Sequence, residues 1–173
     1  MWLAGVVLAA SALAGCASEG AEPEPSATGF ASEAEAFAAA EATYRAYVDA
    51  LNQVDLSDPT TFEEVYRWTT GDANAAARES LSQMHAKGWI KTGENEIRDV
   101  FELNNRTGVT AGVSIVACTE VATVALTDSD GNSVVSADRL DIQAWEVSLV
   151  PDPDSATRLL ITDFYSWSGA PAC

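Results

Sequence analysis

The 173-residue chain carries 26 Asp and Glu residues against 9 Lys and Arg residues, which gives a formal net charge of −17. Because so negative a surface repels phosphate groups, we expect no nucleic acid and no anionic lipid surface among its partners. A single histidine excludes multi-histidine metal sites, and the chain contains no phosphate-binding glycine loop or G-x-S-x-G nucleophile motif. We therefore expect no metal and no cofactor.

The first 15 residues predict a signal peptide. Residues 2–14 are uncharged and consist of apolar and small side chains. This run is too short for a spanning helix of ~20 residues but has the usual length of the apolar part of a signal peptide. The basic start of such a peptide is missing, since the first Lys or Arg is Arg45, which leaves open a start codon further upstream.

The segment LAGC, from Leu13 to Cys16, resembles the lipobox of bacterial lipoproteins. In those proteins the cysteine is linked to diacylglycerol and becomes the first residue of the mature chain. Two or three acyl chains bind a bilayer firmly, because each buried methylene contributes ~0.8 kcal/mol. The resemblance implies lipidation of Cys16 and a lipid-anchored domain on the extracytoplasmic face of the cell membrane. The alternative is an ordinary signal peptide that happens to contain a cysteine.

Residues 16–31 are predicted to form the lipidated cysteine and a flexible acidic linker. They are mainly Ala, Ser, Gly, Glu and Pro with one phenylalanine, which is too little apolar mass to fold. Residues 32–173, about 140 in all, suit a single domain. Its two cysteines, Cys118 and Cys173, are an even pair in an oxidising compartment and indicate one disulfide.

A first helix is predicted from Ser32 onward. Ser32 and Glu35 have the spacing of a capping box, in which each side chain accepts from a backbone amide at the helix start. Apolar residues then recur every three or four positions, so that one side of the helix is buried. They are Phe37, Ala40, Tyr44, Tyr47, Val48, Leu51 and Val54.

Two further helices follow. Thr60 or Thr61, with Glu63 or Glu64 three residues on, repeats the capping signature before a short amphipathic segment that includes Phe62, Val65, Tyr66 and Trp68. A third helix is predicted over residues 73–87, and Gly88 would end it in the left-handed conformation.

After Gly88 the apolar period changes from helical to two, which predicts an antiparallel sheet. Residues 128–131, with sequence DSDG, predict a hairpin turn. Helices first and strands after indicate an α+β domain, with three helices packed on one face of a bent antiparallel sheet. The strands are expected over residues 97–103, 109–127, 140–150 and 158–168.

This order of elements resembles the cone-shaped NTF2-like superfamily, and especially small actinobacterial lipoproteins that carry such a domain behind a lipobox and an acidic linker. The resemblance covers Phe37 to Cys173. It rests on TYRAYVDALNQVDLSDPTTFEEVY in the first two helices, MHAKGW, DSDGNSVVSADR and the closing GAPAC. It implies the fold, export and a Cys118–Cys173 bridge, and it implies no reaction.

Enzymes of the NTF2-like superfamily use an acid or base inside the mouth between helices and sheet. The candidates here are Asp141, Asp163, His85 and Tyr44. Strand alternation places Asp163 on one face with Ile161, Tyr165 and Trp167, either in a desolvated pocket or at an exposed rim. Asp141 shares a face with Gln143 and Trp145, with the same two interpretations.

We expect a partly apolar cleft between the first helix and the sheet, near Tyr44, Trp145 and Asp163. The Tyr44 hydroxyl needs a partner if it is buried, and Asp163 would be that partner or a ligand anchor. The chain is thus predicted to be a membrane-tethered, non-catalytic domain that binds a small molecule or an envelope protein. The alternative is an isomerase- or dehydratase-type enzyme that uses Asp163 or Asp141 as acid or base.

Other conspicuous residues have structural interpretations. His85, in the last turn of a helix, favours a packed side chain or a partner for the helix dipole. Asp128, Asp130 and Asn132 do not have the spacing of a calcium loop and are explained by turn chemistry. Four tryptophans belong either to the core or to a ligand-binding mouth. They are Trp68, Trp89, Trp145 and Trp167.

Overall fold

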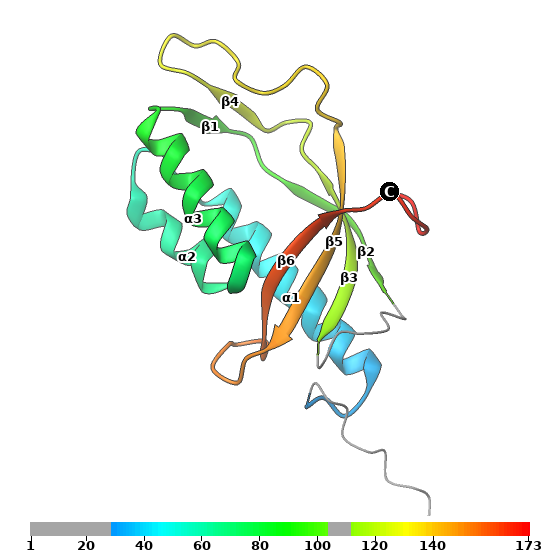
Figure 1. Ribbon diagram of the computed structural model, residues 1–173. Coiled ribbons are helices and arrows are strands. Elements are labelled where there is room, and N and C mark those ends of the chain that lie inside the picture. The colour runs from blue at the N-terminus through cyan, green and yellow to red at the C-terminus, as the bar shows by residue number, and fades with distance from the viewer. Residues whose placement is uncertain (1–28, 104–111) are drawn as a thin grey trace, which may run out of the picture.

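The computed structural model describes residues 29–103 and 112–173, which form an α+β domain with three α-helices and two antiparallel sheets (Figure 1). The predicted signal peptide, Cys16 and most of the predicted linker lie outside the described residues. The elements are α1 (Glu33–Asn52), the 3-10 helix η1 (Pro59–Thr61), α2 (Phe62–Arg67), α3 (Gly71–Ala86), β1 (Ile90–Thr92), β2 (Glu96–Glu102), β3 (Val113–Glu120), β4 (Ala125–Thr127), β5 (Ile142–Pro151) and β6 (Leu159–Ser166).

The larger sheet has four strands in the order β2-β3-β5-β6, and every neighbouring pair is antiparallel. The edge of β6 is extended by the segment after α2. The Ile161 amide donates to the Trp68 carbonyl at 3.0 Å, and the Thr70 amide donates to the Ile161 carbonyl at 2.7 Å. The second sheet is the short pair β1-β4, which lies above the helices in the view of Figure 1.

Helix α1 covers one face of the larger sheet. It contacts β2, β3 and β6, and its apolar stripe is buried with the side chains that those strands and β5 present to it. Helices α2 and α3 instead build a second core with the end of α1 and with Leu126 of β4. Helix α3 also contacts β6. The fully buried members of the main core include Ala40, Ile115, Ala117, Val147, Leu159 and Ile161.

The predicted cap of α1 is present in altered form. The Ser32 hydroxyl accepts from the Glu35 amide at 3.1 Å, as expected. The Glu35 carboxylate, however, accepts from the Ala31 amide at 2.8 Å rather than from the Ser32 amide. The helix therefore begins where the sequence predicts, and the reciprocal hydrogen bond is displaced by one residue.

Composition places Phe30 in the predicted linker, yet it is only 1% exposed and belongs to the main core. The Arg158 guanidinium lies 4.0 Å from the centre of its ring and donates to the Glu35 carboxylate at 2.6 Å. The folded part therefore begins before Ser32. Composition averaged over the linker hides a single large side chain that packs on a distant arginine.

The start of α2 differs from the prediction. Asp58, not a threonine, supplies the cap: its carboxylate accepts from the Thr60 amide at 3.0 Å at the start of η1. The Thr61 hydroxyl donates back to the Asp58 carbonyl at 2.8 Å and makes no cap hydrogen bond to α2. Helix α3 begins at Gly71, two residues before the predicted start, and Gly88 has the expected positive φ of 65°.

The sequence predicts one long strand over residues 109–127. Residues 109–111 lie outside the described part, and the structure divides the remainder between two strands. Strand β3 ends at Glu120, and the chain turns so that the Val124 amide donates to the Val121 carbonyl at 3.0 Å. Arg139 holds this turn, because its guanidinium donates to the carbonyls of Val121 and Val124 at 2.9 and 2.8 Å. Strand β4 then leaves for the second sheet, where it pairs with β1.

The predicted disulfide between Cys118 and Cys173 is present, with the two Cα atoms 5.4 Å apart. Thr119 bonds to Tyr44 of α1, so its neighbour Cys118 faces the opposite side of the sheet. The closing segment is also held by the Trp167 indole, which donates to the Pro171 carbonyl at 2.8 Å. No helix in the two described stretches is both long and apolar enough to cross a bilayer.

Candidate functional site

A cleft of about 290 Å³ lies between α1 and the larger sheet. Helix α1 contributes four lining residues spaced by three or four positions, which places them on the face that the helix turns toward the sheet. The sheet contributes residues from the ends of three strands and the loops beside them. The lining residues are Tyr44, Tyr47, Val48, Leu51, Asn95, Thr119, Val121, Gln143, Trp145 and Phe164.

Aromatic rings make up much of the cleft wall. The Tyr47 ring centre lies 6.2 Å from that of Tyr44 and 5.3 Å from that of Phe164, with interplanar angles of 37° in both pairs. Trp145 meets Phe164 nearly at a right angle, with centres 6.3 Å apart and an interplanar angle of 81°. The four rings thus form a chain in which each contacts the next, and the half-buried Tyr47, Phe164 and Trp145 offer apolar surface to an occupant.

The two tyrosine hydroxyls of the cleft have different surroundings. The Tyr44 hydroxyl shares a 2.6 Å hydrogen bond with the Thr119 hydroxyl, and burial raises its pKa while that bond opposes part of the rise. Burial also raises the pKa of Tyr47 above its usual range, and the neighbouring Tyr44 adds to the effect. Both side chains are therefore neutral near pH 7, and neither is a base at that pH.

The amide side chains at the cleft also differ. Asn95 is tied to the end of α1, because its side chain and its backbone amide both donate to the Asn52 side-chain oxygen at 2.8 Å. The side-chain amide of Gln143 and the hydroxyl of Tyr47 have no hydrogen-bond partner within the described residues. These two groups are available to an uncharged occupant that carries donors and acceptors.

The structure brings two of the three predicted site residues together. Tyr44 and Trp145 both line the cleft, whereas Asp163 does not. The reason is an irregularity between β5 and β6: Leu149 pairs with Ile161, but Ser148 pairs with Asp163, so that Thr162 is an extra residue. The expectation that Asp163 and Ile161 share a face, and that Asp163 is the partner of Tyr44, is wrong.

Phe164 takes the place that alternation assigned to Asp163. It pairs with Val147, whose side chain belongs to the core beneath α1. Asp163, one residue earlier, consequently points to the opposite face of the sheet. A one-residue bulge cannot be recognised from the alternation of apolar and polar residues alone. For this reason the sequence does not identify Phe164 as a cleft residue.

The other candidate acids and bases lie elsewhere. Asp141 is exposed, and its backbone carbonyl accepts from Val121. His85 is exposed, but a ring nitrogen lies 2.7 Å from the Leu56 carbonyl and its ring meets Phe62 edge to face, so its contacts are structural ones at the surface. Asp128 holds its own turn by accepting from two backbone amides. Among residues 29–103 and 112–173, no group of three acidic, histidine or cysteine side chains has the arrangement of a metal site.

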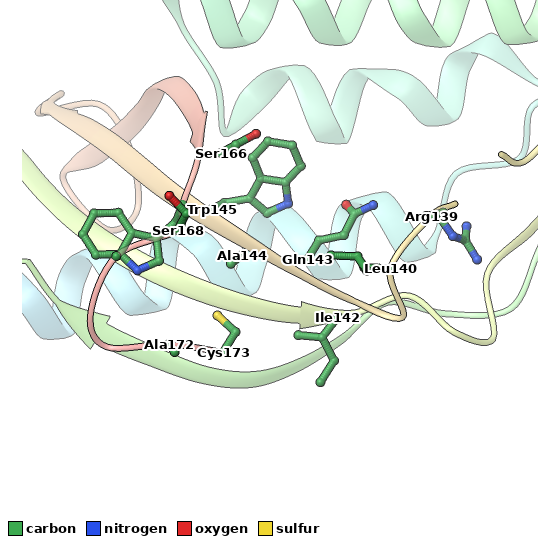
Figure 2. Close-up of a pocket in the computed structure, with 12 residues that line it drawn as sticks. Arg139, Leu140, Ile142, Gln143, Ala144, Trp145, Ser166, Ser168, Ala172 and Cys173 are labelled. Atoms are coloured by element: carbon green, nitrogen blue, oxygen red, sulfur yellow. The ribbon is translucent and has the colours of Figure 1, made fainter. Parts of the chain in front are cut away.

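A second cavity of about 430 Å³, termed the tail cavity, lies between the start of β5 and residues 166–173 (Figure 2). Gln143 and Trp145 line both cavities. In Figure 2 their side chains extend to one side of β5, whereas Ile142 and Cys173 lie on the other. The remaining lining residues are Arg139, Leu140, Ala144, Ser166, Trp167, Ser168, Gly169 and Ala172.

Comparison with known proteins gives no assignment. No family model matches the chain, and no curated protein matches it significantly. Among solved structures, the intermembrane space region of the chloroplast protein ARC6 aligns with a TM-score of 0.47 at 11% identity, over 77% of this chain and 97% of that one. A periplasmic fragment of TraM aligns with a TM-score of 0.40 at 12% identity, over 75% and 98% of the two chains.

Proposed function

We propose that the chain is a lipid-anchored extracytoplasmic domain that binds a small molecule in the cleft between α1 and the larger sheet, without changing it chemically. The export signal and Cys16 of the sequence support the anchor. The Cys118–Cys173 disulfide supports an oxidising compartment, because such bonds rarely persist in a reducing cytoplasm. The fold we propose is NTF2-like, and the packing of α1 across a four-stranded antiparallel sheet supports it.

The uncharged aromatic lining of the cleft is the observation that carries this proposal. Proton-transfer catalysis needs a group that titrates near the working pH and touches the substrate. In the described part of the chain, the cleft lining includes no carboxylate and no imidazole, and the two tyrosines of the cleft have raised pKa values. Of the two acids on which the enzymatic alternative depends, Asp163 lies on the other face of the sheet, and Asp141 is exposed and does not line the cleft. Binding without turnover is what this lining supports.

A ligand-recovery experiment tests the binding function. The full chain is purified from its own membranes under native conditions, and small molecules released on denaturation are identified by mass spectrometry. We expect one compound to be enriched, to raise the melting temperature when it is added back, and to be recovered with its mass unchanged. Saturation at 100 times Kd would add ~2.7 kcal/mol of stability. Conversion of the compound, or no stabilisation by any recovered compound, would contradict the proposal.

A separate experiment tests the anchor. Mass spectrometry of the detergent-extracted chain should find an acylated N-terminal Cys16, and Cys16→Ser should leave the precursor uncleaved or release the protein from the membrane. Cys173, which forms the disulfide with Cys118, offers the matched control, since Cys173→Ser should leave membrane attachment unchanged. A mature chain that starts at another residue and carries no lipid would contradict the anchor but not the binding function.

A further inference from the structure

The chemistry of the cleft limits the class of its occupant, an inference that rests on the proposed binding function. Among the residues that the structure describes, no charged side chain lines the cleft, and the chain as a whole has a net charge of −17. A carboxylate or phosphate would find no counter-charge there and would be repelled at long range. The tail cavity has one cation, Arg139, but its guanidinium already donates to the Val121 and Val124 carbonyls.

A quaternary ammonium occupant fits the cleft less well than an uncharged one. Quaternary ammonium groups bind to aromatic ring faces and make no hydrogen bonds. Such a ligand would cover the Tyr47 hydroxyl and the Gln143 amide and leave both without partners, at a cost in affinity. The occupant should therefore carry uncharged donors and acceptors of its own.

The ring geometry argues against a flat aromatic ligand. A site that holds a flat ligand between two aromatic rings needs those rings near-parallel and ~7 Å apart, which is twice the contact distance between carbon atoms. The ring pairs along the cleft have interplanar angles of 37° and 81° and centre separations of 5.3–6.3 Å. They form an angled wall, which suits a puckered ring whose C–H groups pack on aromatic faces.

The shared wall between the two cavities indicates the length of the occupant. Trp145 and Gln143 line both, so the cleft and the tail cavity adjoin at these two side chains. The tail cavity offers another indole, Trp167, and the hydroxyls of Ser166 and Ser168. The tail cavity, at about 430 Å³, is in the size range of a small-molecule site, and the cleft, at about 290 Å³, is close to its lower end.

We propose that the two cavities together bind an uncharged saccharide of at least two rings, one on each side of Trp145. Sugar rings combine apolar C–H faces with neutral hydroxyls, which matches rings flanked by an amide and hydroxyl groups. The Cys118–Cys173 bridge and the Trp167–Pro171 hydrogen bond hold the wall of the second subsite. The second subsite thus depends on the disulfide, and the first does not.

Calorimetric titration of the full chain in detergent tests this proposal. The probes are neutral saccharides of one to four rings with varied stereochemistry and linkage, together with uronic acids, choline and indole. We expect a two-ring saccharide to bind about tenfold or more tightly than its single ring, and a uronic acid to bind about tenfold more weakly than the matching neutral sugar. Trp145→Ala should weaken the binding of one-ring and two-ring saccharides about tenfold or more. Trp89 lies under Lys87, away from both cavities, so Trp89→Ala should leave the affinities unchanged.

Two changes test the second subsite separately. Reduction of the disulfide and Ser168→Trp, which fills the tail cavity, should each remove the gain from the second ring and leave single-ring affinity unchanged. A two-ring gain that survives both changes would overturn the second subsite. Binding of choline or indole, but of no saccharide, would overturn the ligand class and leave the proposed binding function standing. A chain that binds no probe and yields no recovered compound would refute both.

Discussion

Tyr44 and Tyr47 lie one turn apart on α1 and differ in what their hydroxyl groups contact. Tyr44 is 2% exposed and bonds to Thr119 at 2.6 Å, so Tyr44→Phe would leave the Thr119 hydroxyl buried with one partner fewer. We expect Tyr44→Phe to lower the free energy of unfolding by about 1 kcal/mol. Urea denaturation followed by circular dichroism measures this change.

Tyr47→Phe is the matched control for this prediction. Its hydroxyl has no partner in the described part of the chain, so the same chemical change should cost less than about 0.5 kcal/mol. Equal losses in the two variants would mean that the Tyr44–Thr119 hydrogen bond contributes nothing to stability.

Glu35 should make the stability of the domain depend on pH. Its pKa lies below the ordinary value of 4.5, because it accepts a hydrogen bond from the Ala31 amide and a second from the Arg158 side chain. A lowered pKa means that the stabilisation is complete above pH 4.5 and is lost as the pH falls through the folded value. The Glu35→Gln variant should thus be less stable than the native chain above pH 4.5, and the stabilities of the two should become equal in acid.

The pH dependence is measured by thermal unfolding between pH 3 and pH 7, a range of about four units around the ordinary carboxyl pKa. Glu33→Gln provides the control, since Glu33 lies in the same helical turn and has no hydrogen bond or ion pair within the described residues. Curves for Glu35→Gln that run parallel to the native curve at every pH would rule out this role of Glu35.

Individual site residues were predictable where the local pattern is regular. Tyr44 follows from the helical stripe, and Trp145 with Gln143 from unbroken alternation along β5. The prediction for Asp163 was wrong because Thr162 is an extra residue in β6, so the residues after it lie on the opposite faces of the sheet from those that alternation predicts. The partner of Tyr44 could not be predicted either, since Thr119 is a small side chain 75 positions away that only the packed sheet brings close.

At the scale of elements, the start of α3 is fitted closely against β6. Gly71 has φ of +53°, and a Cβ atom there would lie 2.7 Å from the Thr162 side-chain oxygen. Gly71→Ala should therefore destabilise the domain by about 2 kcal/mol, partly through the left-handed backbone and partly through this contact. Chemical denaturation checks the value.

Gly88→Ala separates the two causes. Gly88 also has a positive φ, +65°, but a Cβ atom there meets nothing within 4 Å, so only the backbone cost of about 1 kcal/mol applies. Adding Thr162→Ala to Gly71→Ala should recover part of the difference. If the two glycine variants are equally destabilised, the close approach of α3 to β6 has no energetic consequence.

The long elements and the short helix α2 were predictable, whereas the three-residue strands were not. Helices α1 and α3 and strands β2, β5 and β6 have enough residues to show a period. Strands β1 and β4 have three residues each, too few for alternation to be visible, and they pair only because the chain turns at Val121. The second sheet, and the division of the long predicted strand, follow from tertiary contacts such as those of Arg139.

At the scale of the whole molecule, the Cys118–Cys173 bridge closes a loop of 55 residues that contains β4, β5 and β6. In the chain-entropy account, such a loop stabilises the fold by about 4 kcal/mol. Cys173→Ser should lower the free energy of unfolding by this amount. The core should stay intact, because the substituted residue Cys173 is exposed and the buried partner Cys118, which is 1% exposed, is unchanged. Denaturant unfolding of the native and variant chains measures the loss.

Reductant supplies the control for the disulfide. It should shift the unfolding midpoint of the native chain to that of Cys173→Ser and leave the variant unchanged. A loss below about 1 kcal/mol would show that the bridge adds little beyond the packing of the closing segment.

The two outer strands of the larger sheet have a consequence for how copies of the chain meet. Strand β2 carries charged side chains at four of its seven positions, and the outer edge of β6 is bonded to the segment after α2 at Ile161. Charged or covered edges are poor templates for another strand. At high concentration, another copy of the chain would therefore encounter charged side chains at the β2 edge of the sheet and backbone groups that are already hydrogen-bonded at the β6 edge. The arrangement opposes edge-to-edge polymerisation, the route by which exposed sheets aggregate.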